Sequence, residues 1–416
     1  MKKRNTKRSQ WIKFGIAIGF LFTLPWYLRF QVKFLQLLEQ NQTTDVNNDE
    51  KIVASEPSNS KTTETSIENL VDKSETDIDS SSVGTHTASS TATVMGLASG
   101  YDLRVYKSFV GSLRNTGYDG HIILGLSEEN LSAESKLYLL SMGVTMKFLN
   151  FIECTSTTPN KLPTEKDIFD GKNCIAPYDH IKITWARFVL QRDWLVQCET
   201  CTGPVLLTDV RDTYFQSNPF AEPEKIEGLQ VFEEYKITTQ YWLAEWPIRE
   251  CKGESFEKPM LCSGTTIGTR QAIIDYVDIM YKEMTEWINQ IQCRFNTIGD
   301  DQSIHNYVFY ANKLPFAKAI PFRTGIVNTV GSIGGEIFED LRARGEENYH
   351  FPGKNGNDWL GKVDFLSFRL TNSEGLFLNE DGSISPIIHQ YDRFGPILST
   401  WLAKQPFMED AVWIKG

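Results

Sequence analysis

Strand-like and helix-like segments alternate along the chain from Thr91 onward, and this alternation limits the possible folds more than any other feature. TATVMGLASG is apolar throughout, as buried strands are, and the helical periodicity that follows it ends at Gly117. HIILGLS then predicts a second strand, a second helix starts after Ser132, and VTMKFLN predicts a third strand. Since strands that alternate with helices form parallel sheets covered on both faces, the sequence predicts an α/β fold of Rossmann type with a mixed, mainly parallel sheet.

The segments further along extend this pattern. Residues 151–177 are polar and predict a loop or insertion, whereas residues 178–197 predict an amphipathic helix that leads into the strand PVLLTD. A strand near MLCSG and helices over 270–294 and 300–311 follow, and the Gly-rich remainder predicts irregular structure. We therefore expect residues 91–416 to form one domain.

The first ninety residues predict a membrane anchor and a stem. MKKRNTKR carries five positive charges and precedes an apolar run, residues 11–28, which only Lys13 interrupts. Roughly 18 helical residues span about 27 Å, which is close to the thickness of a bilayer core. The basic cluster predicts that residues 1–10 are cytoplasmic and that the rest is lumenal; a cleaved signal peptide is the alternative. Residues 29–90 are expected to be a largely disordered stem, because they become rich in Ser, Thr and acids and poor in aromatics.

Charge and cysteine content narrow the possible partners and compartment. Only one of the 53 acidic residues but eight of the 42 basic ones precede residue 41, so the remainder carries 52 acidic and 34 basic residues. A body this acidic repels phosphate backbones, so the balance argues against nucleic acid as a partner. All seven cysteines follow the anchor, where thiols are expected to oxidise, and the odd number leaves at least one unpaired. Cys198 and Cys201 form a C-x-x-C that could bind zinc or act in redox chemistry, although no second such pair accompanies it. Asn41 and Asn130 lie in N-glycosylation sequons.

The clearest chemical motif is VLLTDVRDTYFQSNPF, in which an apolar strand ends at Asp209 and Asp212 follows after a short turn. Ligands of open α/β sheets bind beyond the carboxyl ends of the strands. Two neighbouring carboxylates repel each other, and a divalent cation that bridges them to a diphosphate relieves the repulsion. The alternative interpretation is that the two acids only cap a turn.

This motif resembles the metal-binding DxD segment of GT-A-fold nucleotide-diphospho-sugar transferases. It is most similar to a group of eukaryotic type II enzymes with the pattern L-T-D-V-R-D-x-x-F-Q-x-x-P-F. Asp212 matches the second Asp of the DxD segment, whereas Asp209 lies one residue further away than the first. The resemblance covers most of residues 91–396. It implies a GT-A-like fold, Mn²⁺ or Mg²⁺ as the metal, a UDP- or GDP-sugar donor, a glycan or glycoprotein acceptor and a Golgi membrane location, with a retaining mechanism favoured.

The resemblance also implies roles for residues on either side of the motif. A basic residue on the preceding helix faces the nucleotide, and Lys182 and Arg187 are the candidates. Arg187 is preferred because it lies among apolar residues, and a buried guanidinium needs an anionic partner. Ser263 and Gly264, in LCSGTTIG, match the small-residue segment that approaches the donor or acceptor sugar. Ordinary ion pairing and ordinary turn glycines are the alternatives.

Two further elements follow in the order of the family. Asp301 and Gln302, in GDDQSIHNYVFY, match its acid-Gln helix start; with Asp300 as the helix cap, Asp301 would be free to bind a sugar hydroxyl or to act as a base. His389, after a short apolar strand, matches the histidine that completes the metal site, and imidazole is an acceptable ligand for manganese. A structural histidine is the alternative. Glu233 and Glu234 are weaker candidates for the sugar site.

Two other functions remain to be weighed against a metal-dependent glycosyltransferase. One is a catalytically inactive transferase-like domain that serves as a lectin or as the partner subunit of a Golgi enzyme. The other is a lumenal sulfotransferase, which needs a basic phosphate-binding loop after its first strand. TVMGLASGYDL has no such loop, so the sequence disfavours a sulfotransferase.

Overall fold

The computed structural model describes residues 91–153, 174–237, 242–290, 293, 300–346, 365–394 and 396–409. All of them belong to one compact unit, Gly84–Gly416. The expected cytoplasmic tail, membrane anchor and stem lie outside the described residues. Within those residues, every helix is too short or too polar to cross a membrane.

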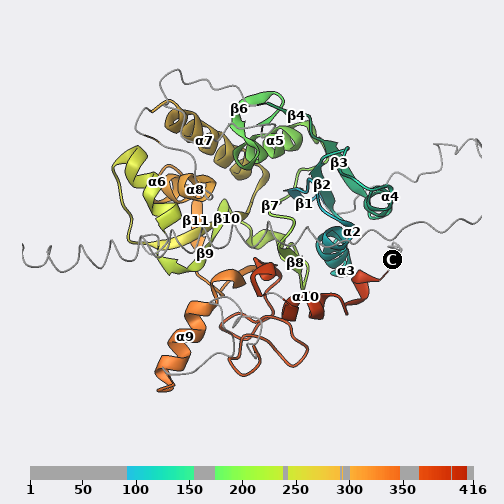
Figure 1. Cartoon of the computed structure of the whole chain (residues 1–416), viewed down its shortest axis with the longest axis vertical. Coiled ribbons are helices and arrows are strands. Elements are labelled where there is room, and N and C mark those ends of the chain that lie inside the picture. The colour runs from blue at the N-terminus through green and yellow to red at the C-terminus, as the bar shows by residue number, and fades with distance from the viewer. Residues whose placement is uncertain are drawn as a thin grey trace, which may run out of the picture. The chain divides into compact units, whose positions relative to one another are not determined.

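A mixed sheet is the centre of the fold. Among the described residues it has seven strands in the order β11-β9-β10-β7-β1-β2-β3 (Figure 1). Adjacent strands are parallel, except that β10 runs antiparallel to both β9 and β7. In the same order, the strands cover Ala317–Ile320, Leu229–Ile237, Pro259–Gly268, Val205–Thr208, Thr93–Leu97, His121–Leu126 and Val144–Phe148. The expected α/β architecture with a mixed, largely parallel sheet is confirmed.

Helices cover both faces of this sheet because its central strands are apolar on both sides. Val94 of β1 packs into one core cluster, and its neighbour Met95 packs into the other. Figure 1 shows α5 and α7 together on one side of the sheet, with α2 and α3 on the other. The helices are α2 (Leu103–Tyr106), the π-helical η1 (Lys107–Gly111), α3 (Ser112–Asn115), α4 (Ala133–Ser141), α5 (Ile183–Gln197), α6 (Trp242–Lys252), α7 (Arg270–Ile288), α8 (Asp300–Tyr310), α9 (Gly334–Ala343) and α10 (Pro396–Leu402).

The ends of α4 are those that the sequence predicts. The Ser132 hydroxyl accepts a hydrogen bond from the backbone N–H of Ser135, so Ser132 is the N-cap. Gly143 follows the helix with φ 64°, a backbone conformation that glycine adopts without strain. By contrast, α7 ends at Ile288, earlier than the periodicity predicted, and Asp300 is the first residue of α8 rather than its cap.

A second, smaller sheet lies beyond the main one. Its strands, in the order β12-β13-β8, are Val327–Thr329, Ile387–His389 and Thr213–Phe215. One of its faces packs on a separate apolar cluster that includes Tyr214 and Ile388 together with side chains of α9 and α10. The segment expected to be irregular therefore contributes strands to an ordered layer. Short 3₁₀ turns cover Pro223–Lys225, Val330–Ser332, Tyr391–Phe394 and Pro406–Met408.

The helix expected from Tyr178 is shorter than predicted. Residues 178–182 form strand β6 of a third sheet, with β4 (Phe151–Ile152) and β5 (Cys174–Ile175), and α5 begins only at Ile183. Tyr178 pairs with Ile175, and Lys182 pairs with Cys174. This antiparallel pairing provides the backbone hydrogen bonds that a helix would have provided, so it overrides the local apolar periodicity. Of the expected loop over 151–177, residues 154–173 lie outside the described part.

Candidate active site

The two acids of the motif stand at the two ends of a loop that joins the main sheet to the second sheet. Asp209 directly follows β7, and Asp212 directly precedes β8. The backbone N–H of Asp209 donates to the carbonyl of Gly264 on the neighbouring strand β10 at 2.8 Å, which fixes the start of the loop. Both carboxylates are thus held at the carboxyl end of β7, where the sequence placed them.

His389 reaches the same place from the C-terminal end of the chain. It ends β13, lies opposite Thr213 in the strand register, and is 1% exposed. Ligand-capable atoms of Asp209, Asp212 and His389 all lie within 4.8 Å of one another. The structure therefore brings together the three residues that the sequence grouped as metal ligands. We refer to them as the acid-histidine cluster.

Gly264 leaves the space between two members of this cluster open. A Cβ on Gly264 would lie 2.5 Å from Nε2 of His389 and 2.7 Å from Oδ2 of Asp209, distances at which something must shift. Gly264 lies inside strand β10 and so does Gly268, so neither is a turn glycine. The missing side chain of Gly264 creates room for a small ligand between the imidazole and the carboxylate.

The buried charge of Asp212 makes the cluster suitable for a cation. Desolvation by burial raises the pKa of the Asp212 carboxyl, and the negative charge of Asp209 raises it further, whereas His389 lowers it. Its side chain is only 8% exposed, so water does little to stabilise the carboxylate. Two carboxylates and an imidazole around an open space match the ligands that Mn²⁺ accepts. The residues present thus fit a divalent metal.

Arg187 joins the cluster to a third carboxylate. One Nη atom of its guanidinium pairs with Oδ1 of Asp209, and the other donates to Oδ2 of Asp301 at 2.7 Å. Burial lowers the pKa of Arg187, but these two carboxylates more than offset that effect, and the pKa lies above its ordinary value. The anionic partners expected for a buried Arg187 are carboxylates of the chain itself. The second carboxylate oxygen of Asp209, Oδ2, faces Gly264 and is not the oxygen that pairs with Arg187.

Asp301 and Gln302 are both held by neighbours. Oδ2 of Asp301 also accepts from the Ser263 hydroxyl at 3.3 Å, so Asp301 is not free, contrary to the sequence expectation. Gln302 donates through Nε2 to Oε1 of Glu234 at 2.9 Å, and Glu234 is 3% exposed. Glu233, its neighbour, is partly exposed, and burial raises the pKa of its carboxyl. Arg187, Asp301 and Ser263 therefore form a network continuous with the acid-histidine cluster, and Glu234 and Gln302 lie beside it.

Lys182 occupies a different position from Arg187. It ends β6 and is the N-cap residue of α5, and its ammonium lies 5.6 Å from the centre of the Trp185 ring. Arg187, the preferred basic candidate, forms an ion pair with Asp209 of the cluster.

Two residues near the cluster were missed by the sequence analysis. Tyr101 follows the carboxyl end of β1; burial raises its pKa, Arg211 lowers it, and both Asp209 and Asp212 raise it further. Arg211 lies between the two acids in the chain and forms an ion pair with Asp392 at 3.3 Å. The signal for Tyr101 was its place just beyond the turn that follows the first strand, since ligands bind at that edge of the sheet.

The cysteines of the described residues are mostly oxidised. Cys198 pairs with Cys201 and Cys251 with Cys293, and Cys174 is also disulfide-bonded. The C-x-x-C segment is thus a disulfide, and a ring nitrogen of the nearby His121 lies within 4.8 Å of both sulfur atoms. Cys262 is free and buried.

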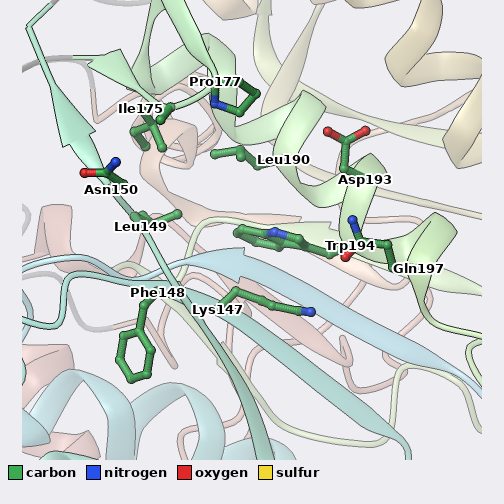
Figure 2. A pocket seen from close by; sticks show the side chains of 11 residues that line it. Lys147, Phe148, Leu149, Asn150, Ile175, Pro177, Leu190, Asp193, Trp194 and Gln197 are labelled. Carbon is green, nitrogen blue, oxygen red and sulfur yellow. The ribbon is translucent and has the colours of Figure 1, made fainter.

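A hollow of about 310 Å³ lies between α5, the end of β3 and the turn after β5. Figure 2 shows the Trp194 ring on the wall of this hollow, between Leu190 and Lys147. None of the residues that line it belongs to the acid-histidine cluster. The lining comprises Lys147, Phe148, Leu149, Asn150, Ile175, Ala176, Pro177, Leu190, Asp193, Trp194 and Gln197.

In comparisons with known proteins, no protein-family model matches this chain, and no curated protein is significantly similar to it.

Proposed function

We propose that the protein is a metal-dependent glycosyltransferase with a GT-A-like fold, which moves a sugar from a UDP- or GDP-sugar to a glycan or glycoprotein acceptor. The observation that carries the proposal is the acid-histidine cluster, Asp209, Asp212 and His389, at the carboxyl end of β7. Parallel α/β sheets bind their ligands at this edge, and the open space at Gly264 has room for an ion. The mixed sheet and its two helical layers are compatible with the fold that the resemblance implies.

The cluster would hold Mn²⁺ or Mg²⁺ through Oδ2 of Asp209, the carboxylate of Asp212 and Nε2 of His389. When bound, the metal neutralises negative charge on the departing nucleoside diphosphate. Arg187 keeps Asp209 in place by pairing with Oδ1, the oxygen that would not bind the metal. The same guanidinium links the cluster to the carboxylate of Asp301. Tyr101 provides an aromatic ring at the same edge, where a nucleotide would lie.

Asp301 and Gln302 would bind the transferred sugar, and a retaining mechanism is favoured by the resemblance. Arg187 and Ser263 fix the orientation of Asp301, so a sugar hydroxyl would meet a carboxylate that is already positioned. This arrangement supports a role for Asp301 in substrate positioning.

The disulfides support the proposed location in the Golgi lumen. Cys198–Cys201 and Cys251–Cys293 are compatible with an oxidising compartment and with a catalytic domain on the lumenal side of a type II anchor.

The test is release of nucleotide from a panel of UDP- and GDP-sugars by the detergent-solubilised full-length protein, with Mn²⁺ and with EDTA. We expect Mn²⁺-dependent release from one donor, abolished in Asp212→Asn and retained in Glu374→Gln, which changes an exposed acid. A folded protein that neither hydrolyses any donor nor binds UDP or GDP in Mn²⁺ would overturn the proposal. Nucleotide binding without turnover, even with glycan acceptors present, would instead favour the inactive, lectin-like alternative.

A further inference from the structure

Two threonines connect His389 to the backbone of Asp209 through a chain of hydrogen bonds. Nδ1 of His389 lies 3.0 Å from the Thr213 hydroxyl, which lies 3.2 Å from the Thr208 hydroxyl. The Thr208 hydroxyl in turn lies 3.4 Å from the carbonyl oxygen of Asp209. All three side chains are at most 4% exposed, so water does not compete for the two bonds between them, whereas the bond to the carbonyl of Asp209 is partly buried.

The last bond of the chain fixes the direction of all the others. A carbonyl oxygen only accepts, so the Thr208 hydroxyl must donate to Asp209. Because a hydroxyl has a single hydrogen, Thr208 must then accept from Thr213, and the hydrogen of Thr213 is used in turn. Thr213 can therefore only accept from His389, and Nδ1 of the imidazole must carry a hydrogen.

We infer that Thr213, oriented by Thr208, is a positioning residue that holds the neutral form of His389 in the tautomer with its hydrogen on Nδ1 and its lone pair on Nε2. Nε2 is the nitrogen that faces Gly264 and the Asp209 carboxylate. Oδ1 of Asp212 is 3.7 Å from Nδ1, too far to replace Thr213 as the acceptor. This chain of hydrogen bonds, which we call the hydroxyl relay, thus orients the lone pair of Nε2 toward the place where a cation would bind.

This direction matters because a neutral imidazole has one donor nitrogen and one acceptor nitrogen, and only the acceptor can bind a metal. Metal-bound histidines commonly have their second nitrogen fixed by such an outer partner, and loss of the partner costs about 10–100-fold in metal affinity. The assignment of the tautomer rests on the hydrogen-bond chain alone. Its consequence for metal binding rests on the proposed function.

The tautomer can be measured without any metal. Imidazole ¹⁵N labelling of the full-length protein in detergent, with EDTA at neutral pH, separates protonated from unprotonated ring nitrogens by NMR. His389→Gln identifies the signal among those of the six histidines. We expect Nδ1–H in the wild type and in Thr213→Ser, and Nε2–H or a mixture in Thr213→Val.

Thr208→Val provides a second variant that leaves the contact with His389 intact. It frees the Thr213 hydroxyl to donate to Nδ1, so we expect a shift toward Nε2–H here as well. A wild-type Nε2–H signal, or Nδ1–H retained in both valine variants, would overturn the inference.

Electron paramagnetic resonance titration with Mn²⁺ then distinguishes the inference from the proposed function. We expect about 10–100-fold weaker Mn²⁺ binding in Thr213→Val and near wild-type binding in Thr213→Ser. If the tautomer is as assigned but the wild type binds no Mn²⁺, the proposed function fails while the relay stands. If Mn²⁺ binds but the tautomer differs from the assigned one, the relay fails while the proposed function stands.

Discussion

Gly264 lies directly against His389, so close that a Cβ at this position would come within 2.5 Å of Nε2. Gly264→Ala should therefore move the imidazole or the Asp209 carboxylate while leaving strand β10 paired. A displacement of about 1 Å at a reacting centre costs on the order of 100-fold in rate. We expect donor hydrolysis to fall by about that factor, with the thermal unfolding midpoint in EDTA changed little. Full activity in Gly264→Ala would show that the space is not used.

The Asp212→Asn variant separates the destabilising effect of the buried charge from the contribution of that charge to metal binding. The carboxylate is buried beside Asp209, which is unfavourable in the absence of a cation, so the uncharged amide should leave the metal-free protein at least as stable as the wild type. The stabilisation that the wild type gains from Mn²⁺ should be lost. Differential scanning calorimetry with and without Mn²⁺ measures both effects. A variant that is less stable in EDTA yet still stabilised by Mn²⁺ would contradict this prediction.

Arg187→Met should be strongly destabilising, because it leaves the carboxylates of Asp209 and Asp301 without their shared guanidinium. Removal of one partner from a buried ion pair costs about 3–5 kcal/mol. Arg187→Lys keeps the charge but loses the two-pronged geometry, so its loss should be smaller. Urea denaturation of the wild type, Arg187→Lys and Arg187→Met measures their free energies of unfolding, which should decrease in this order. Equal stabilities would mean that solvent satisfies the two acids.

His305 predicts acid sensitivity. It is fully buried against the hydroxyl of Tyr276, and burial lowers its pKa to about 3. Between that value and the ordinary pKa near 6.5, the unfolded chain binds a proton that the folded protein does not, so the free energy of unfolding falls as the pH falls. The slope is at most about 1.4 kcal/mol per pH unit. Denaturation of wild type and His305→Gln between pH 7 and pH 4 tests this: the variant should show the shallower pH dependence.

The sequence predicted the local parts of the site better than the contacts between them. An apolar run that ends in an acid identified β7 and Asp209, and a short apolar run placed His389 at the end of β13. The alternation of strands and helices predicts that Asp209 lies at the carboxyl edge of the main sheet, whereas His389 reaches that edge on β13 of the second sheet, which this alternation does not predict. By contrast, the ion pairs of Arg187 join residues far apart in the chain, and no local pattern specifies which carboxylates a guanidinium will meet.

The same limit explains the misassigned helix start. Tyr178–Lys182 fits a helical periodicity, and the hairpin partner that turns it into a strand is the separate segment Cys174–Ile175. The hydroxyl relay was also beyond prediction, because Thr208 and Thr213 resemble ordinary strand residues until β13 places His389 beside them.

The position of His389 on β13 determines when the cluster can form during synthesis. β7 and the two acids leave the ribosome long before β13, and the main sheet can pair as soon as β11 has emerged. A nascent or prematurely terminated chain would thus contain the whole main sheet but lack the imidazole. If the cluster binds a metal as proposed, metal capture would report that translation has passed residue 389.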